Sequence, residues 1–286
     1  MTNKLGESAM KVENEKDVEI KVVGIGKIGN SALNEMIKGK AVEADFVAVS
    51  EKQENLDLLE IGTKILITEN FEEKMKKVLE NTDMVFILAE TDEAENVKIS
   101  TAVAKIAQSL EILTISIIAA PSAAEFEKNG KAELKQFTDI IITIPFEKVS
   151  EEINKIFIRN IKVVVDIIRE RGIINLDFAD VNSMLKNGGT AVLGYGTAVG
   201  ENKEEVIVKQ VLNKILSEKS VKNARKILMN IVAGPEIGLT ELSKITRILE
   251  EELEVYKARI VWAYAMKPDM KGIVRMTLIA TDFSDE

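Results

Sequence analysis

The sequence predicts an α/β protein in which a mostly parallel sheet, one long connecting helix and a smaller α/β part with a mixed sheet follow one another. Three observations carry this prediction. Apolar runs alternate with amphipathic stretches over residues 18–145, apolar residues recur at helical spacing over 151–171, and strand-like stretches of a different character follow. The expected division is a disordered tail at 1–17, a first domain at 18–150, a connecting helix at 151–174 and a second domain at 175–286.

The first domain is expected to alternate strands with helices. Its apolar runs show no polar alternation, as in strands that are buried on both faces of a parallel sheet. Strands are predicted at 19–23, 46–49, 64–67, 83–89, 113–119 and 139–144. Helices are predicted from 31, over 71–79 and over 97–110.

The long helix and the second domain follow the same reasoning. Apolar residues repeat through 151–171 for about five turns of helix, and Gly172 ends the pattern. Strands are then predicted within 190–196 and 224–233, and a helix over 240–253. The last two strands, at 258–265 and 272–281, are expected to be neighbours in a mixed or antiparallel sheet.

Composition excludes several classes of function. The 286 residues carry a net charge of −9 with no basic stripe, which argues against a nucleic-acid partner. The chain has no cysteine and no histidine, so we expect no disulfide and no metal site, and catalysis would rest on carboxylates, lysines or hydroxyls. No apolar run is long enough to span a membrane and no secretory signal is present, so the cytoplasm is the expected location.

The turn at 90–96, between a predicted strand and a predicted helix, holds four acids and no glycine. In doubly wound α/β proteins such a turn binds phosphates through backbone N–H groups at the helix N-terminus. Carboxylates placed there are expected to cap the helix dipole themselves and to repel a polyphosphate.

A glycine pattern follows the first strand. Gly24, Gly26 and Gly29, with Asn30 after them, match G-x-G-x-x-G in the setting that a Rossmann-like dinucleotide site requires. Glu51, after the second strand, is the candidate acid for a ribose. The alternative is that these glycines keep a tight strand-to-helix turn without any ligand.

A second group of polar residues follows the long helix. Asn175, Asp177 and Asp180 are spaced as Asn-x-Asp-x-x-Asp. Alone, this spacing is typical of a helix N-cap in which Asp177 satisfies free N–H groups of a helix that ends near Leu185.

Further motifs accompany that group in a fixed order, and together they resemble the tubulin/FtsZ superfamily, specifically bacterial FtsZ. The resemblance covers nearly the whole chain, about residues 20–283. The segments that carry it are 175–196, 200–202, 224–225, 230–236 and 274–281. In that family the Asn-x-Asp-x-x-Asp loop enters the nucleotide pocket of the next subunit and its carboxylates orient the attacking water. The resemblance therefore implies that Asn175, Asp177 and Asp180 are catalytic toward a neighbour.

The nucleotide-binding motifs of the family are poorly matched in this sequence. The glycine-rich signature of the family falls on residues 92–98 without a match, and the first loop holds Lys27 and Ile28. Four other positions also depart from the family pattern. Ser50-Glu51-Lys52 replaces the family's Asn-Thr-Asp after the second strand, Phe146 stands where the family has its base-recognising asparagine, and Lys155 stands where the long helix has an aspartate. The segment 121–139 is several residues shorter than the family's sugar-contacting loop. No cofactor is therefore expected, with Gly24, Gly26, Gly29 and Asn30 as the remains of the first nucleotide loop.

The resemblance implies an FtsZ-like bacterial cytoskeletal protein related to cell division. We expect a pseudo-GTPase that self-assembles or modulates filaments of a genuine FtsZ. The chain ends just past the last predicted strand, so no direct membrane contact is expected. Alternatives are an active GTPase, with GTP in a rebuilt pocket, and a dinucleotide-dependent oxidoreductase.

Three lysines stand at positions that depart from the family pattern. Lys27, Lys98 and Lys155 are candidates for an interface that receives the neighbour's Asp177 and Asp180 without nucleotide. The alternative is that they are solvated charges in a lysine-rich protein.

Overall fold

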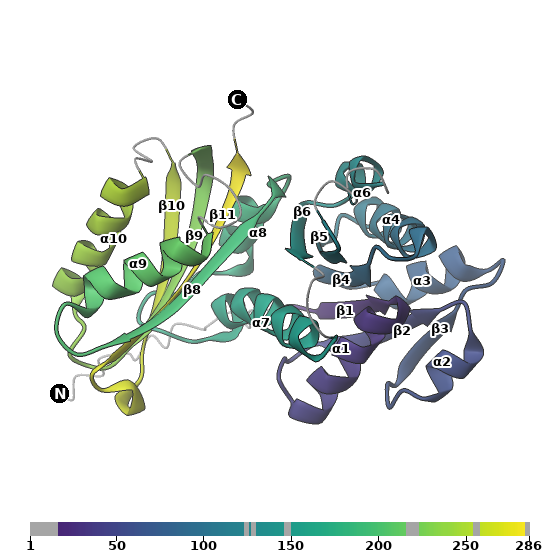
Figure 1. The fold of residues 1–286 in the computed structure, drawn as a ribbon, viewed down its shortest axis with the longest axis horizontal. Helices are drawn as coiled ribbons and strands as arrows, with labels where there is room; N and C mark the ends of the chain where they lie inside the picture. The colour runs from purple at the N-terminus through teal and green to yellow at the C-terminus, as the bar shows by residue number, and fades with distance from the viewer. Residues whose placement is uncertain are drawn as a thin grey trace, which may run out of the picture.

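The computed structural model describes residues 17–122, 126, 130–145, 150–215, 223–253 and 258–283. Two β-sheets lie side by side, and the long helix α7 (Ser150–Arg169) runs between them (Figure 1). This arrangement confirms the predicted fold class. The tail expected at 1–17 lies outside the described residues, apart from Asp17.

The N-terminal sheet has seven strands in the order β3-β2-β1-β4-β5-β6-β7, and every pairing is parallel. Its central strands are buried along their whole length, as their unbroken apolar sequence predicts. The bounds are β1 Ile20–Ile25, β2 Asp45–Ser50, β3 Thr63–Leu66, β4 Met84–Glu90, β5 Leu113–Ala120, β6 Ile140–Pro145 and β7 Gly189–Thr190. The short β7 comes from beyond α7 in sequence, so the second half of the chain completes the first sheet.

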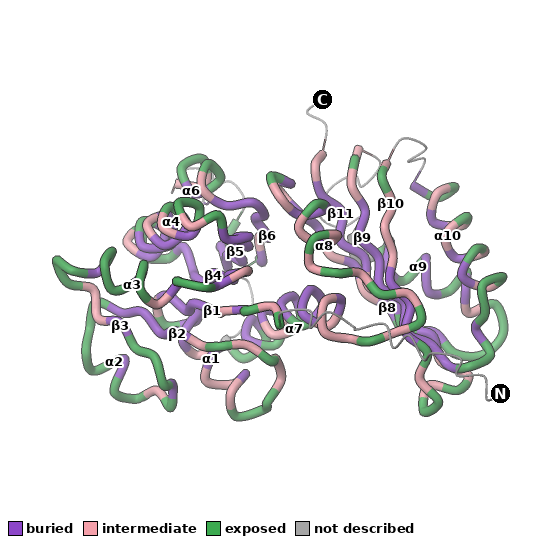
Figure 2. The backbone as a smooth tube through the Cα atoms, turned by 180° about the vertical axis from the view of Figure 1, so that it is seen from behind, coloured by how far each residue is buried: buried purple, intermediate pink, exposed green. Residues whose placement is uncertain are grey.

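Helices cover both faces of this sheet. α1 and α7 pack on one face, and α3, α4 and α6 pack on the other. Figure 2 shows the strands as the buried layer, with exposed residues on the outer sides of the helices. The bounds are α1 Gly26–Gly39, α2 Gln53–Asp57, α3 Phe71–Leu79, α4 Ala94–Ser109 and α6 Lys131–Phe137.

The C-terminal sheet has four strands in the order β10-β9-β11-β8, and β10–β9 is its one parallel pairing. α9 and α10 share a hydrophobic core with the strands. The bounds are α8 Phe178–Leu185, β8 Val192–Val199, α9 Lys203–Ile215, β9 Ala224–Ala233, α10 Leu239–Leu253, β10 Arg259–Met266 and β11 Ile273–Phe283.

The prediction that the last two strands are neighbours is wrong, because β9 lies between β10 and β11. β10 follows α10, and a strand–helix–strand connection places the second strand parallel to the first, beside β9. β11 then returns antiparallel on the other edge of β9.

One buried carboxylate connects the first half of the chain, at β5, with the second half, at the segment that leads into β7. Asp139, just before β6, accepts hydrogen bonds from the backbone N–H groups of Thr114 (2.9 Å) and Asn187 (3.1 Å). The Lys186 ammonium lies 3.2 Å from the same carboxylate. Asp139 thus joins β5 to the segment that leads from α8 into β7.

Candidate functional site

A cleft lined by polar and apolar residues lies beside the glycine turn, at the carboxyl ends of β1, β2 and β4. It has a volume of about 560 Å³ and includes residues from the first turn of α1, the end of β2 and the turn after β4. The order of the sheet reverses direction between β1 and β4, and ligands of open α/β sheets bind where the order reverses. The cleft is therefore the candidate site.

The side chain of Glu90 already occupies the N-terminus of α1 within this cleft. Glu90 Oε1 accepts hydrogen bonds from the backbone N–H groups of Lys27 (2.6 Å) and Ile28 (3.1 Å), and Oε2 accepts one from Gly29 (3.2 Å). Those are the free donors of a helix start, where a phosphate binds in nucleotide-binding folds. The protein supplies its own anion at that point.

The fold explains how Glu90 reaches a helix more than sixty residues away in sequence. Glu90 is the last residue of β4, and β4 pairs in parallel with β1, which leads into α1. Gly26 makes the turn at φ +74°, and a Cβ there would lie 2.5 Å from Glu90 Oε1. A side chain at position 26 would therefore displace the Glu90 carboxylate.

Glu90 is 2% exposed, and its burial raises the pKa of the carboxyl group above the ordinary value of 4.5. The N–H donors of Ile28 and Gly29 act in the opposite direction by stabilising the ionised form, and the nearby charge of Asp92 adds to the increase.

This raised pKa predicts a pH dependence of stability. The part of the free energy of unfolding that this pKa shift supplies is fully present below pH 4.5, the pKa of Glu90 in the unfolded chain. It is lost as the pH rises through the pKa of Glu90 in the folded protein. Chemical denaturation from pH 4 upward should therefore show the free energy of unfolding falling more steeply in the wild type than in Glu90→Gln. Parallel curves would contradict the assignment.

The other residues of the first loop serve the fold in this structure. A Cβ at Gly29 would lie 2.4 Å from the carbonyl oxygen of Leu88, so glycine lets α1 approach β4 closely. The Asn30 side chain donates both of its hydrogens, to the carbonyl oxygens of Gly26 (2.8 Å) and Val49 (2.9 Å). Of the four residues that the sequence offered for ligand binding, Gly26 and Asn30 line the cleft. Gly24 and Gly29 are buried and do not line it.

The acids of 90–96 include Glu95 in the first turn of α4, where its charge faces the helix dipole as expected, but Glu93 at the N-cap makes no capping hydrogen bond. Asp92 accepts a hydrogen bond from the N–H of Glu93 at 2.9 Å. Glu95 pairs with Lys98 at 2.9 Å. The acid that caps a helix is Glu90, and the helix is α1.

The structure does not gather the three candidate interface lysines in the cleft. Lys27 lines it. Lys98 lies on the exposed side of α4 in its ion pair with Glu95, and Lys155 is exposed on α7. Phe146, the residue at the base-recognising position, lies outside the described residues.

The segment from Asn175 to Asp180 spans the end of the connection between α7 and α8 and the first turn of α8. Asn175 Oδ1 accepts a hydrogen bond from the N–H of Gly172 (2.6 Å), and Asp177 Oδ1 accepts one from the N–H of Asp180 (2.7 Å). Asp177 is therefore the N-cap of α8. This role needs the side-chain oxygen of Asp177 but not its charge.

Substitutions at Asp177 separate these two properties. Asp177→Ala removes the cap and should lower the free energy of unfolding by about 1 kcal/mol, whereas Asp177→Asn should keep most of it. Urea denaturation of both variants checks the role. Equal losses in the two variants would show that the charge, and not the cap, stabilises the loop.

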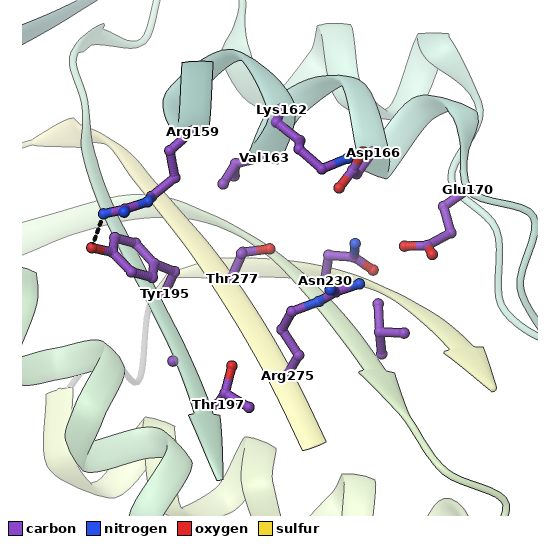
Figure 3. Close-up of a pocket in the computed structure, with 12 residues that line it drawn as sticks. Arg159, Lys162, Val163, Asp166, Glu170, Tyr195, Thr197, Asn230, Arg275 and Thr277 are labelled. Carbon is purple, nitrogen blue, oxygen red and sulfur yellow. Dashed lines mark hydrogen bonds and ion pairs between the residues drawn. The ribbon is translucent and has the colours of Figure 1, made fainter. Parts of the chain in front are cut away.

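A second, smaller cleft of about 160 Å³ lies between α7 and the C-terminal sheet (Figure 3). Arg159 of α7 lies over the ring of Tyr195 of β8, 4.3 Å from its centroid, and hydrogen-bonds its hydroxyl group. Lys162 and Asp166 of α7 form an ion pair of 2.8 Å beside it. The contact between Arg159 and Tyr195 holds the helix against the sheet.

Comparison with known proteins shows a similarity to FtsZ. The model of the FtsZ family, C-terminal domain, matches residues 189–284. The cell division proteins FtsZ of Rickettsia bellii and Rickettsia felis are 27% and 28% identical to the chain over 92% of its length. These matches confirm the resemblance to the tubulin/FtsZ superfamily.

Solved structures share its fold. An empty FtsZ dimer of M. jannaschii superposes with a TM-score of 0.78 at 24% identity, covering 94% of this chain and 89% of that one. TubZ of Bacillus thuringiensis serovar israelensis, in GDP-form protofilaments, gives 0.72 at 10% identity, covering 94% and 86%. The chain is FtsZ-like in sequence and in fold, and it spans 66–67% of the length of the two curated Rickettsia relatives.

Among the residues that the structure describes, no group of three acidic, histidine or cysteine side chains lies close enough together to hold a metal ion. No helix in that same part of the chain combines the length and the apolar character needed to cross a membrane.

Proposed function

We propose that this FtsZ-like protein is a pseudo-GTPase whose own carboxylate replaces the phosphate of a nucleotide. The observation that carries the proposal is the position of Glu90, which takes three N–H donors at the start of α1. The protein would then act in the cytoplasm through filament contacts, with itself or with a genuine FtsZ, and without nucleotide turnover.

Electrostatics supports the loss of nucleotide binding. A phosphate brought to α1 would meet Glu90, and Asp92 and Glu93 line the same cleft. Two unit charges about 4 Å apart at an effective dielectric constant of 20 repel each other by about 4 kcal/mol, which weakens binding by about three orders of magnitude. Expulsion of Glu90 would leave its buried carboxylate to find new partners, at a further cost.

An apolar end of the C-terminal sheet supports the contact with a neighbouring subunit. Ile173, Val199, Leu239 and Met266 are all at least 40% exposed. Val199 and Met266 are the last residues of β8 and β10, at the same end of the sheet, and the N–H of Ile173 bonds to β10 at Tyr264. The Asn175–Asp180 loop begins beside this surface, so a subunit that receives the loop would also cover these apolar side chains.

Assembly without nucleotide tests the proposal. Sedimentation of the purified protein, free of GTP and magnesium, should show polymers that Asp177→Lys abolishes and Asp177→Asn weakens less. In a second assay, substoichiometric amounts of the protein should change the light scattering and GTP turnover of a genuine FtsZ. A monomer at all concentrations, together with no effect on FtsZ, would refute the proposal.

One observation favours the alternative of an active GTPase with a rebuilt pocket. The cleft beside Glu90 is still open, with a volume of about 560 Å³. If that alternative holds, the protein hydrolyses GTP, and hydrolysis requires Asp177 and Asp180 of the neighbouring subunit. A turnover assay at high protein concentration separates the two functions, because the pseudo-GTPase gives no phosphate release above the blank.

A further inference from the structure

The charges that line the cleft beside Glu90 favour a cationic ligand. Four carboxylates face two ammonium groups there, a formal excess of two negative charges. The charged residues are Lys27, Glu51, Lys52, Glu90, Asp92 and Glu93. Asp92 and Glu93 are exposed and lie at the mouth, whereas the Glu90 carboxylate is already bound to α1.

Buried amide groups in the same cleft have hydrogen-bonding atoms without partners. Asn30 and Asn96 are each 5% exposed, and Asn30 Oδ1 and Asn96 Nδ2 make no hydrogen bond within the described residues. Asn34 Oδ1 is also buried and also makes no hydrogen bond within the described residues. Because unpaired polar atoms are costly when buried, such atoms in a cleft indicate a polar ligand. The acceptors among them, added to the carboxylates, call for a ligand rich in N–H donors.

Part of the remaining wall of the cleft is apolar, beside the polar residues Ser31, Ser50 and Asn55. Val49, Leu58, Leu59 and Ile99 line it, and the side chain of Leu58 is 81% exposed although it is large and hydrophobic. A ligand that fits must therefore present methylene groups between its charged nitrogens.

We propose that this cleft binds a linear polyamine, with its ammonium groups on the Asp92, Glu93 and Asn30 side and its methylene chain against Leu58 and Leu59. A metal ion does not fit, because the described residues contain no cluster of three suitable ligand side chains. The proposal goes beyond the proposed function, since it holds whether or not the chain assembles.

Titration calorimetry with spermidine tests this site on the full chain in about 150 mM salt, where long-range attraction is screened. Spermidine should bind with a Kd below about 1 mM, and magnesium chloride at equal concentration should not replace it. The double variant Asp92→Asn/Glu93→Gln should weaken binding about tenfold to a hundredfold. Leu58→Ser should weaken it by a smaller factor.

A matched control removes two negative charges elsewhere. Glu72→Gln/Glu73→Gln changes two exposed acids of α3 that do not line the cleft, and it should leave the Kd within about twofold of the wild type. Equal losses in the two double variants would mean nonspecific attraction and would overturn the site. No binding, with polymer formation that depends on Asp92 and Glu93, would also overturn it and would indicate lysines of a second copy as the occupant.

Discussion

Glu90→Ala is expected to destabilise the protein and to make it responsive to phosphate. The substitution leaves the N–H groups of Lys27, Ile28 and Gly29 without their acceptor, at a cost of about 1–3 kcal/mol. Inorganic phosphate or pyrophosphate can then bind at the start of α1. At a concentration of about 100 times its Kd, the anion should restore about 2.7 kcal/mol. Urea denaturation with and without phosphate measures both effects.

Glu93→Ala is the matched control for this rescue. Glu93 lies in the same turn, is exposed and makes no side-chain cap, so its removal should change stability by less than about 0.5 kcal/mol. Phosphate also stabilises many proteins by exclusion from their surface, and the control corrects for this. If phosphate stabilises Glu90→Ala no more than Glu93→Ala, the start of α1 is not an anion site.

Asp139→Ala is expected to cause the other large effect. The substitution leaves two backbone N–H groups and the Lys186 ammonium without their shared acceptor, at a cost of about 3–5 kcal/mol. Because Asp139 joins β5 to the segment entering β7, the contact between the two halves of the chain should weaken with it. Thermal unfolding should therefore lose cooperativity as well as midpoint temperature.

Asp45→Ala provides the comparison for Asp139. Asp45 also forms an ion pair, with Lys21 at 3.0 Å, but its side chain is 69% exposed. Exposed pairs contribute about 0–1 kcal/mol, so this variant should remain close to the wild type. A loss at Asp139 no greater than the loss at Asp45 would show that the buried network is dispensable.

Local elements of this fold could be predicted from the sequence because their causes are local. The helix predicted at 71–79 has the same ends in the structure, where Phe71, Met75 and Leu79 form its buried face. The apolar pattern at 151–171 matches α7 to within one residue at its start and two at its end, whereas the connecting helix expected at 151–174 ends five residues earlier, at Arg169. α9 (Lys203–Ile215) was not predicted, although its apolar residues pack into the core of the C-terminal sheet.

The features that could not be predicted depend on contacts between distant segments. The neighbours of β10 follow from the order of the sheet, which the local pattern does not contain. The sequence predicted that Glu90 acts at the start of α4, the helix that follows it. Its hydrogen-bond partners instead lie in α1, 61–63 residues away in sequence. A usable signal did exist, because Glu90 ends a buried strand that pairs with the strand before the glycine turn, and parallel strands end at the same edge of a sheet.

For the segment from Asn175 to Asp180, the structure of a single chain accounts for one of the two predicted roles. The spacing of Asn175, Asp177 and Asp180 predicted both a cap and an action on a neighbour. The structure accounts for the cap through the 2.7 Å hydrogen bond to Asp177. The action on a neighbour remains a prediction, because it requires a second subunit.

Equilibrium binding of fluorescent GTP and GDP to the wild-type protein shows whether Glu90 excludes the nucleotide. The titration is run with and without magnesium, since a bridging cation is the means by which Asp92, Glu93 and Glu95 would accept phosphates. We predict no binding with a Kd below about 10 μM, which corresponds to roughly −7 kcal/mol, in either condition. Tighter binding in either condition would mean that Glu90 does not exclude GTP, and it would favour the alternative of an active GTPase.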